Sequence, residues 1–244
     1  MTNIANAAAP ASTVKIVEEE KLKDSDLNKN IAGLVLFPTA YRQDDMKGPA
    51  IDFTLTNIVG ELYGKRKKSA ATEYTSPILM SIVTLSAKWS LLTDTGNIPV
   101  ALSAGSIFSL ALDLGNKINS ELDYKNYSRP SAATGLFINT SKKIINKQSR
   151  ITLGYVTGGY SKIFANFAPY YYPEKSDIVY LGLDLNTKKR GMYLEIVKPT
   201  ETLQNPLLIN MNFKFRKLPI IVFSYLTTKS GNSLLGIVNI RVPL

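Results

Sequence analysis

The chain has 244 residues, and its 29 Lys and Arg outnumber its 19 Asp and Glu, which gives a formal net charge of +10. It contains neither Cys nor His, so disulfide frameworks, thiol redox chemistry, histidine-ligated zinc and Ser-His-Asp triads are excluded. With 45% hydrophobic and 20% charged residues, its composition is that of a folded chain and not of a disordered one.

The first 30 residues differ in composition from the rest. Met1–Thr13 is small and polar, whereas residues 14–30 are dense in charges of both signs. We predict a flexible tail over residues 1–30 and one β domain over residues 31–244. The tail lacks the apolar core of about 7–15 residues that a secretory signal requires, and no apolar run in the chain reaches the ~18 residues of a membrane-spanning helix.

Beyond residue 50, apolar residues recur at every second position, which indicates β-strands because side chains alternate between the two faces of a strand. In residues 79–91, for example, Leu85 and Trp89 fall on one face, and Thr84 and Lys88 fall on the other. Residues 219–228 are apolar on both faces. Together these segments predict about ten strands and no long helix; the alternating ones are 51–60, 79–91, 100–113, 179–186, 191–196, 207–216 and 238–244.

Polar and glycine-rich stretches between these segments predict turns and loops. They are residues 64–76, 115–131, 186–191, 198–205 and 229–233. Residues 98–114 are rich in Ala and Leu, as helices are, but their regular alternation and Gly105 favour a strand. We interpret Gly158 and Gly159 as a bulge or bend within a long strand.

Strand length separates two classes of β protein. Residues 50–63, 78–92 and 98–114 sustain alternation for longer than the typical soluble strand of about 5–6 residues. A transmembrane β-strand needs about 9–11 residues. One face of these segments is bulky and aliphatic, the other is small or polar, and much of the charge falls in loops. This pattern predicts an antiparallel, up-and-down transmembrane β-barrel with an apolar exterior and a polar interior.

The layout resembles that of small bacterial outer-membrane β-barrels over about residues 31–244. The resemblance rests on the alternating strands, on the entry segment Gly33–Tyr41, and on aromatic residues near strand ends, namely Tyr63, Trp89, Tyr155, Tyr160 and Tyr170–Tyr172. It departs from that class at Arg241–Leu244, where such barrels often have a terminal aromatic residue. The resemblance implies location in an outer membrane, contact with membrane lipid, and a role as a small pore or as a structural or docking protein.

A barrel of about ten strands has a narrow interior largely filled by side chains. Charged residues on the polar faces would line this lumen; they are Lys88, Asp113, Asp184, Glu195, Lys214, Arg216 and Arg241. Because Lys and Arg are in excess, the sequence predicts that small anions are preferred if the barrel conducts.

No catalytic, metal or cofactor constellation is present. The barrel enzymes of outer membranes generally rely on a histidine, which this chain lacks, so we expect a protein without enzymatic activity. Gly60–Lys65 has the wrong spacing for a phosphate-binding loop. The basic cluster Lys65, Arg66, Lys67 and Lys68 is best explained as a solvated loop; binding to lipid head groups is the second interpretation and binding to nucleic acid the third.

A second class of protein also fits the pattern. A soluble jelly-roll β-sandwich, acting as a virion coat protein or as a cytoplasmic nucleic-acid-binding protein, would share the many strands and the basic balance. The tail does not favour this alternative, because residues 1–30 hold four lysines against five acidic residues.

Overall fold

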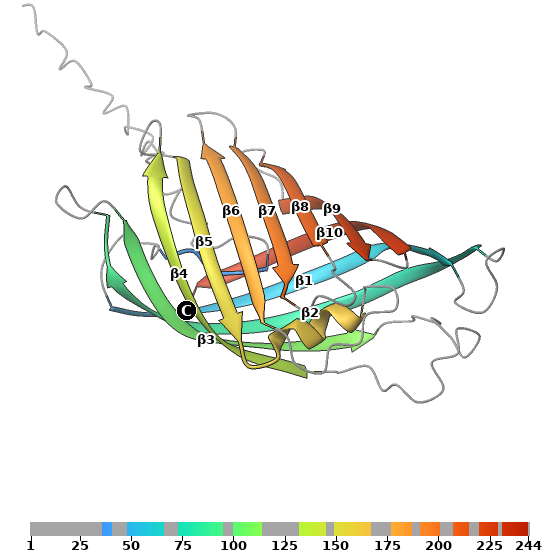
Figure 1. Ribbon diagram of the computed structural model, residues 1–244, viewed down its shortest axis with the longest axis horizontal. Coiled ribbons are helices and arrows are strands. Elements are labelled where there is room, and N and C mark those ends of the chain that lie inside the picture. The colour runs from blue at the N-terminus through green and yellow to red at the C-terminus, as the bar shows by residue number, and fades with distance from the viewer. Residues whose placement is uncertain are drawn as a thin grey trace, which may run out of the picture.

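A computed structural model shows that the chain forms a single closed β-barrel (Figure 1). The structure describes residues 36–40, 48–65, 73–94, 100–113, 132–144, 149–166, 177–186, 191–200, 207–214, 220–228 and 231–243. The predicted tail over residues 1–30 and the loop 115–131 lie outside these ranges. Within them, no helix is long and apolar enough to span a bilayer.

The barrel has ten antiparallel strands. They are β1 (Gly48–Lys65), β2 (Glu73–Leu92), β3 (Ala101–Asp113), β4 (Ala132–Ile144), β5 (Ser149–Thr157), β6 (Ile178–Asn186), β7 (Gly191–Pro199), β8 (Leu207–Lys214), β9 (Ile220–Thr228) and β10 (Gly231–Pro243). The predicted strand over residues 98–114 is confirmed as β3. Residues 132–144 and 149–157, which the sequence analysis did not single out, form β4 and β5.

Each strand pairs with its neighbours in sequence, and β1 pairs with β10 to close the barrel. The closing register runs from Asp52 opposite Pro243 to Gly64 opposite Gly231. This up-and-down order confirms the predicted antiparallel β-barrel. The jelly-roll alternative is wrong, because a jelly roll has two packed sheets joined by Greek-key crossings.

The alternation places apolar side chains outside and polar ones inside. On β2, Leu85 and Trp89 are exposed, whereas Thr84 and Lys88 are buried in the lumen. The ambiguous segment 219–228 follows the same rule, since Phe223 lies outside and Ser224 lies inside. The closed sheet satisfies the hydrogen bonds between strands all the way round, so no sheet edge is left open.

The interior divides into an apolar zone at one end and a polar zone at the other. On β7, β8 and β9, the neighbouring residues Val197, Leu208 and Leu226 are buried and belong to the apolar zone. The next inward-facing row on the same strands is polar and consists of Glu195, Asn210 and Ser224. The apolar zone also includes Ile58, Met80, Ile82, Ile107, Phe137, Val156, Ile178, Leu235 and Ile237. The polar zone also includes Asp52, Thr54, Lys88, Ser90, Ser103, Asn139, Ser141, Thr152 and Asp184.

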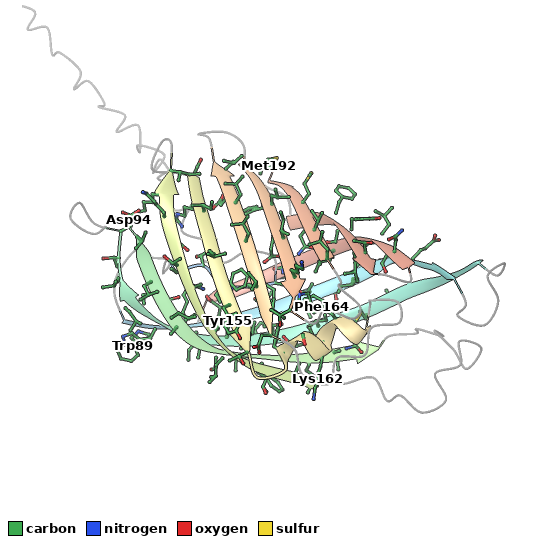
Figure 2. All side chains as sticks on the ribbon, viewed as in Figure 1. Trp89, Asp94, Tyr155, Lys162, Phe164 and Met192 are labelled. Atoms are coloured by element: carbon green, nitrogen blue, oxygen red, sulfur yellow. The ribbon has the colours of Figure 1, made fainter. Side chains whose placement is uncertain are left out.

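A short 3-10 helix, η2 (Tyr160–Asn166), closes the apolar end (Figures 1 and 2). Its Ile163 and Phe164 side chains are buried in the apolar zone. Gly158 and Gly159 lead into it with φ angles of 89° and 84°, in the left-handed region that favours glycine. The expectation of a bulge inside a long strand is therefore wrong, because β5 ends at Thr157 and the two glycines turn the chain inward.

Candidate functional site

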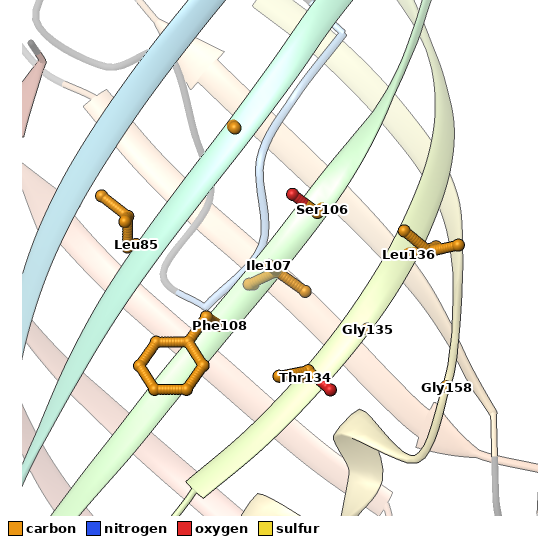
Figure 3. Close-up of a pocket in the computed structure, with 9 residues that line it drawn as sticks. Leu85, Ser106, Ile107, Phe108, Thr134, Gly135, Leu136 and Gly158 are labelled. Carbon is orange, nitrogen blue, oxygen red and sulfur yellow. The ribbon is translucent and has the colours of Figure 1, made fainter.

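Residues 36–40 lie inside the polar zone and cross the lumen from β7 to β2. We call this segment the strap; its residues are Leu36, Phe37, Pro38, Thr39 and Ala40. In Figure 3, which looks onto the outer wall, a thin blue segment runs behind the strands. Phe37, Thr39 and Ala40 are almost completely buried, with exposed fractions of 0%, 3% and 1%.

At one end of the strap, the Glu195 carboxylate of β7 accepts hydrogen bonds from the main chain. The Leu36 N–H lies 3.3 and 3.2 Å from its two oxygens, and the Phe37 N–H lies 3.3 Å from Oε1. Asn210 donates to Glu195 Oε2 at 2.6 Å, and Ser224 donates in turn to Asn210 Oδ1 at 2.6 Å. This row across β7, β8 and β9 orients a carboxylate that is 0% exposed.

In the middle of the strap, the Pro38 carbonyl accepts two hydrogen bonds. Asn139 Nδ2 of β4 donates at 2.8 Å, and the Tyr180 hydroxyl of β6 donates at 3.0 Å. Ser103 fixes the Asn139 amide by donating to Oδ1 at 2.7 Å. Proline has no N–H, so burial at Pro38 leaves no main-chain donor to satisfy.

At the other end, β2 and β4 hold Thr39 and Ala40. Lys88 Nζ donates to the Thr39 carbonyl at 3.2 Å, and Ser90 donates to the Ala40 carbonyl at 3.2 Å. The Ala40 N–H donates to Ser141 Oγ at 3.0 Å. The side chains of the lumen thus pair with main-chain donors and acceptors of the strap.

The Phe37 ring anchors the strap in an aromatic pocket. It stacks on Tyr180 with centroids 4.5 Å apart and an interplanar angle of 14°, and it meets Tyr160 edge-on at 5.7 Å and 69°. Burial raises the pKa of Tyr160 to about 12, so its hydroxyl stays neutral and hydrogen-bonds Ser109 at 2.7 Å. The sequence predicts Tyr160 as one of the aromatic residues near strand ends; Tyr160 does follow β5, but its ring faces inward.

Gly154 on β5 makes room for the Tyr180 ring. A Cβ atom added at Gly154 would lie 2.1 Å from Tyr180 Cζ, much closer than van der Waals contact. The glycine therefore allows Tyr180 to lie flat between the barrel wall and Phe37. No signal in the sequence links Gly154 to Phe37, because the contact exists only after the barrel closes around the strap.

The structure describes three of the seven predicted lumen charges. Lys88, Asp184 and Glu195 are all buried, and Lys88 and Glu195 hold opposite ends of the strap. The side chains of Asp113, Lys214 and Arg241 lie outside the described part, although their backbones are in strands. Arg216 and the basic cluster Arg66–Lys68 also lie outside it, and Lys65 is the last residue of β1.

Apart from the lumen site, a cavity lies on the outer wall, where β2, β3 and β4 meet (Figure 3). It has a volume of about 330 Å³ and is bordered by the exposed side chains Leu85, Phe108 and Leu136, with Ser106 and Gly158 at its margin. This notch is apolar and open. It carries no charged lining residue and has no contact with the lumen site.

Comparisons with known proteins assign no family. No family model matches the chain, and no curated protein matches its sequence. Among the described residues, no group of three or more Asp and Glu lies close enough together to hold a metal ion. The lumen site is therefore characterised by its geometry alone, as a site that holds the main chain of a short segment.

Substituting Gly154 tests whether the strap depends on the space beside Tyr180. We expect Gly154→Ala to lower the free energy of unfolding by about 1–3 kcal/mol, the usual cost of overpacking. Gly236→Ala is the matched control, because its added Cβ would meet only Val59 O at an ordinary 3.6 Å. Denaturant titration of both variants measures the difference, and equal stabilities would contradict the packing described for Tyr180.

Proposed function

We propose that the protein is a membrane-embedded β-barrel of the outer-membrane kind, with a structural or docking role. The observation that carries this proposal is the polarity of the wall. Large apolar side chains are exposed on every strand except β7, where Met192, Leu194 and Ile196 are half-exposed. A soluble barrel would turn these side chains inward, whereas an apolar band facing outward is what lipid requires.

The distribution of exposed charge supports the same proposal. Among side chains that the structure describes, the exposed charged residues are Glu61, Lys142 and Lys198. Each lies close to the end of its strand, so the middle of the described wall carries no exposed charge. Trp89 and Tyr155 are exposed near the ends of β2 and β5, as aromatic residues near a membrane interface would be.

Strand length is compatible with a single crossing of the bilayer. β5, β6, β7 and β9 have nine residues each and β8 has eight, near the 9–11 residues that a tilted strand uses to cross the hydrocarbon. β1 and β2 are longer, with 18 and 20 residues, and would extend beyond it. The notch between Leu85, Phe108 and Leu136 would be filled by lipid tails.

The filled lumen favours a structural or docking role over transport. The strap occupies the polar zone, and η2 packs into the apolar zone. The described interior charges do not favour anion selectivity either. Buried Asp52, Asp184 and Glu195 accompany Lys88, with Arg150 opposite Asp184 across β5 and β6.

The first prediction from this proposal concerns whether the folded chain associates with membranes. If the apolar wall meets lipid, the folded chain should sediment with membranes and require detergent to remain monodisperse. Flotation of the full chain with liposomes, followed by extraction with detergent or with carbonate, measures this. A folded monomer that stays in solution without detergent would contradict the proposal.

A second prediction uses Met211, which lies near the middle of β8 and is 40% exposed. Met211→Arg should lower stability in lipid by about 2–4 kcal/mol, because a cation there would face the bilayer interior. An exposed site on a soluble protein would change by less than about 0.5 kcal/mol. Denaturant titration in lipid vesicles gives the value, with Met211→Leu as the control for lost packing.

The closed lumen gives a third prediction. The full chain reconstituted in planar bilayers should show no steady ionic current, because strap and helix fill both zones of the lumen. Insertion is checked independently by protease protection of the same proteoliposomes. A steady current, whether selective for anions or for cations, would contradict the closed lumen and restore a pore as the role of the barrel.

A further inference from the structure

We propose that the polar zone of the lumen is a binding site for a short peptide segment, and that the strap is its intramolecular occupant. A separate peptide of the same chemistry, with an aromatic residue followed by proline and small residues, would compete for this site. The proposal goes beyond the membrane role and does not depend on it, because it rests on the lumen contacts alone.

The contacts are those of a site that recognises main chain. The lumen donates to the carbonyls of Pro38, Thr39 and Ala40 and accepts from the N–H groups of Leu36, Phe37 and Ala40. A separate peptide of the same sequence offers the same groups in the same order when it adopts the bends that the strap has at residues 36, 37 and 40. In peptide recognition, hydrogen bonds to the main chain supply affinity, while side-chain pockets supply specificity.

The pocket that supplies specificity is the aromatic pocket formed by Tyr180 and Tyr160. The Phe37 ring lies between Tyr180 and Tyr160 and is fully buried, so an aromatic side chain is selected at this position. A proline at the next position suits the site, because only its carbonyl is engaged.

The lumen side chains are held in position by the barrel itself. Ser224 and Asn210 orient Glu195, Ser103 orients Asn139, and Thr152 contacts Ser141 at 2.8 Å. A site that orders its groups before binding loses less conformational freedom when the ligand arrives. These contacts are between strand residues, so they do not require the strap itself.

The covalent connection of the strap to β1 makes it a strong competitor. A tethered ligand has an effective concentration of about millimolar, so a separate peptide should bind poorly to the native chain. Weakening the strap at Phe37 should expose the site without altering any residue that lines it.

The experiment measures binding of a fluorescent synthetic peptide that spans residues 34–42. The full chain is purified in detergent as the wild type and as Phe37→Ala, with Phe37→Leu as a second variant that preserves more of the packing. Folding of each is checked by circular dichroism. We expect the peptide to bind the Phe37 variants at least about tenfold more tightly than the wild type, because the tethered competitor is weakened.

Two controls assign the binding to the lumen. Phe223→Ala removes a phenylalanine that is 62% exposed on the outer wall, and it should leave peptide binding as weak as in the wild type. Adding Glu195→Gln to a Phe37 variant should weaken binding by about tenfold, because a charge-assisted acceptor of the peptide N–H groups is lost.

Equal binding to the wild type, to the Phe37 variants and to Phe223→Ala would assign the peptide to the outer wall or the detergent and overturn the proposal. Absence of binding to a folded Phe37→Ala or Phe37→Leu chain would also overturn it. Neither result bears on membrane partition, so failure here is distinct from failure of the proposed function.

Discussion

Pairing of β1 with β10 is the constraint on which the rest of the structure depends. Closure converts a ribbon of alternating residues into a wall with an inside and an outside, and it fixes the side on which each residue lies. Thirteen residues of β1 have a partner in β10, from Asp52 to Gly64. Once this register is set, a slip of β1 by one residue would turn its apolar side chains into the lumen and its polar side chains to the exterior.

A barrel of this size has to fill its interior. Eight-stranded barrels are just filled by their own side chains, and wider ones leave space. Here the two halves of the lumen are filled in different ways. At the apolar end, η2 adds Ile163 and Phe164 to a packed core. At the polar end, strand side chains are short, and the strap occupies the remaining space with main chain, whose hydrogen-bonding groups match Glu195, Asn139 and Lys88.

Alternation in the sequence was enough to predict seven of the ten strands, the two faces of the wall and a barrel of about ten strands, but it did not identify β4 and β5. It identified Lys88, Asp184 and Glu195 as inward-facing because period two is a local property of the chain. It could not reveal that Ile58 and Met80 face inward, since these apolar residues interrupt an otherwise polar face. The strap and the room that Gly154 gives Tyr180 were also beyond prediction, because both depend on residues brought together only by closure.

The position of the strap determines an order of events during folding. Residues 36–40 precede β1 by seven residues, and β1 is the strand that completes the ring with β10, at the far end of the chain. Contacts between such distant segments form late, because a long loop has to be closed first. If the ring closed before the strap was in place, the segment would have to be threaded through one end of a finished barrel. The simpler route lays the strap against β2, β4, β6 and β7 while the sheet is still an open trough. The last strand pair then completes the wall around the segment.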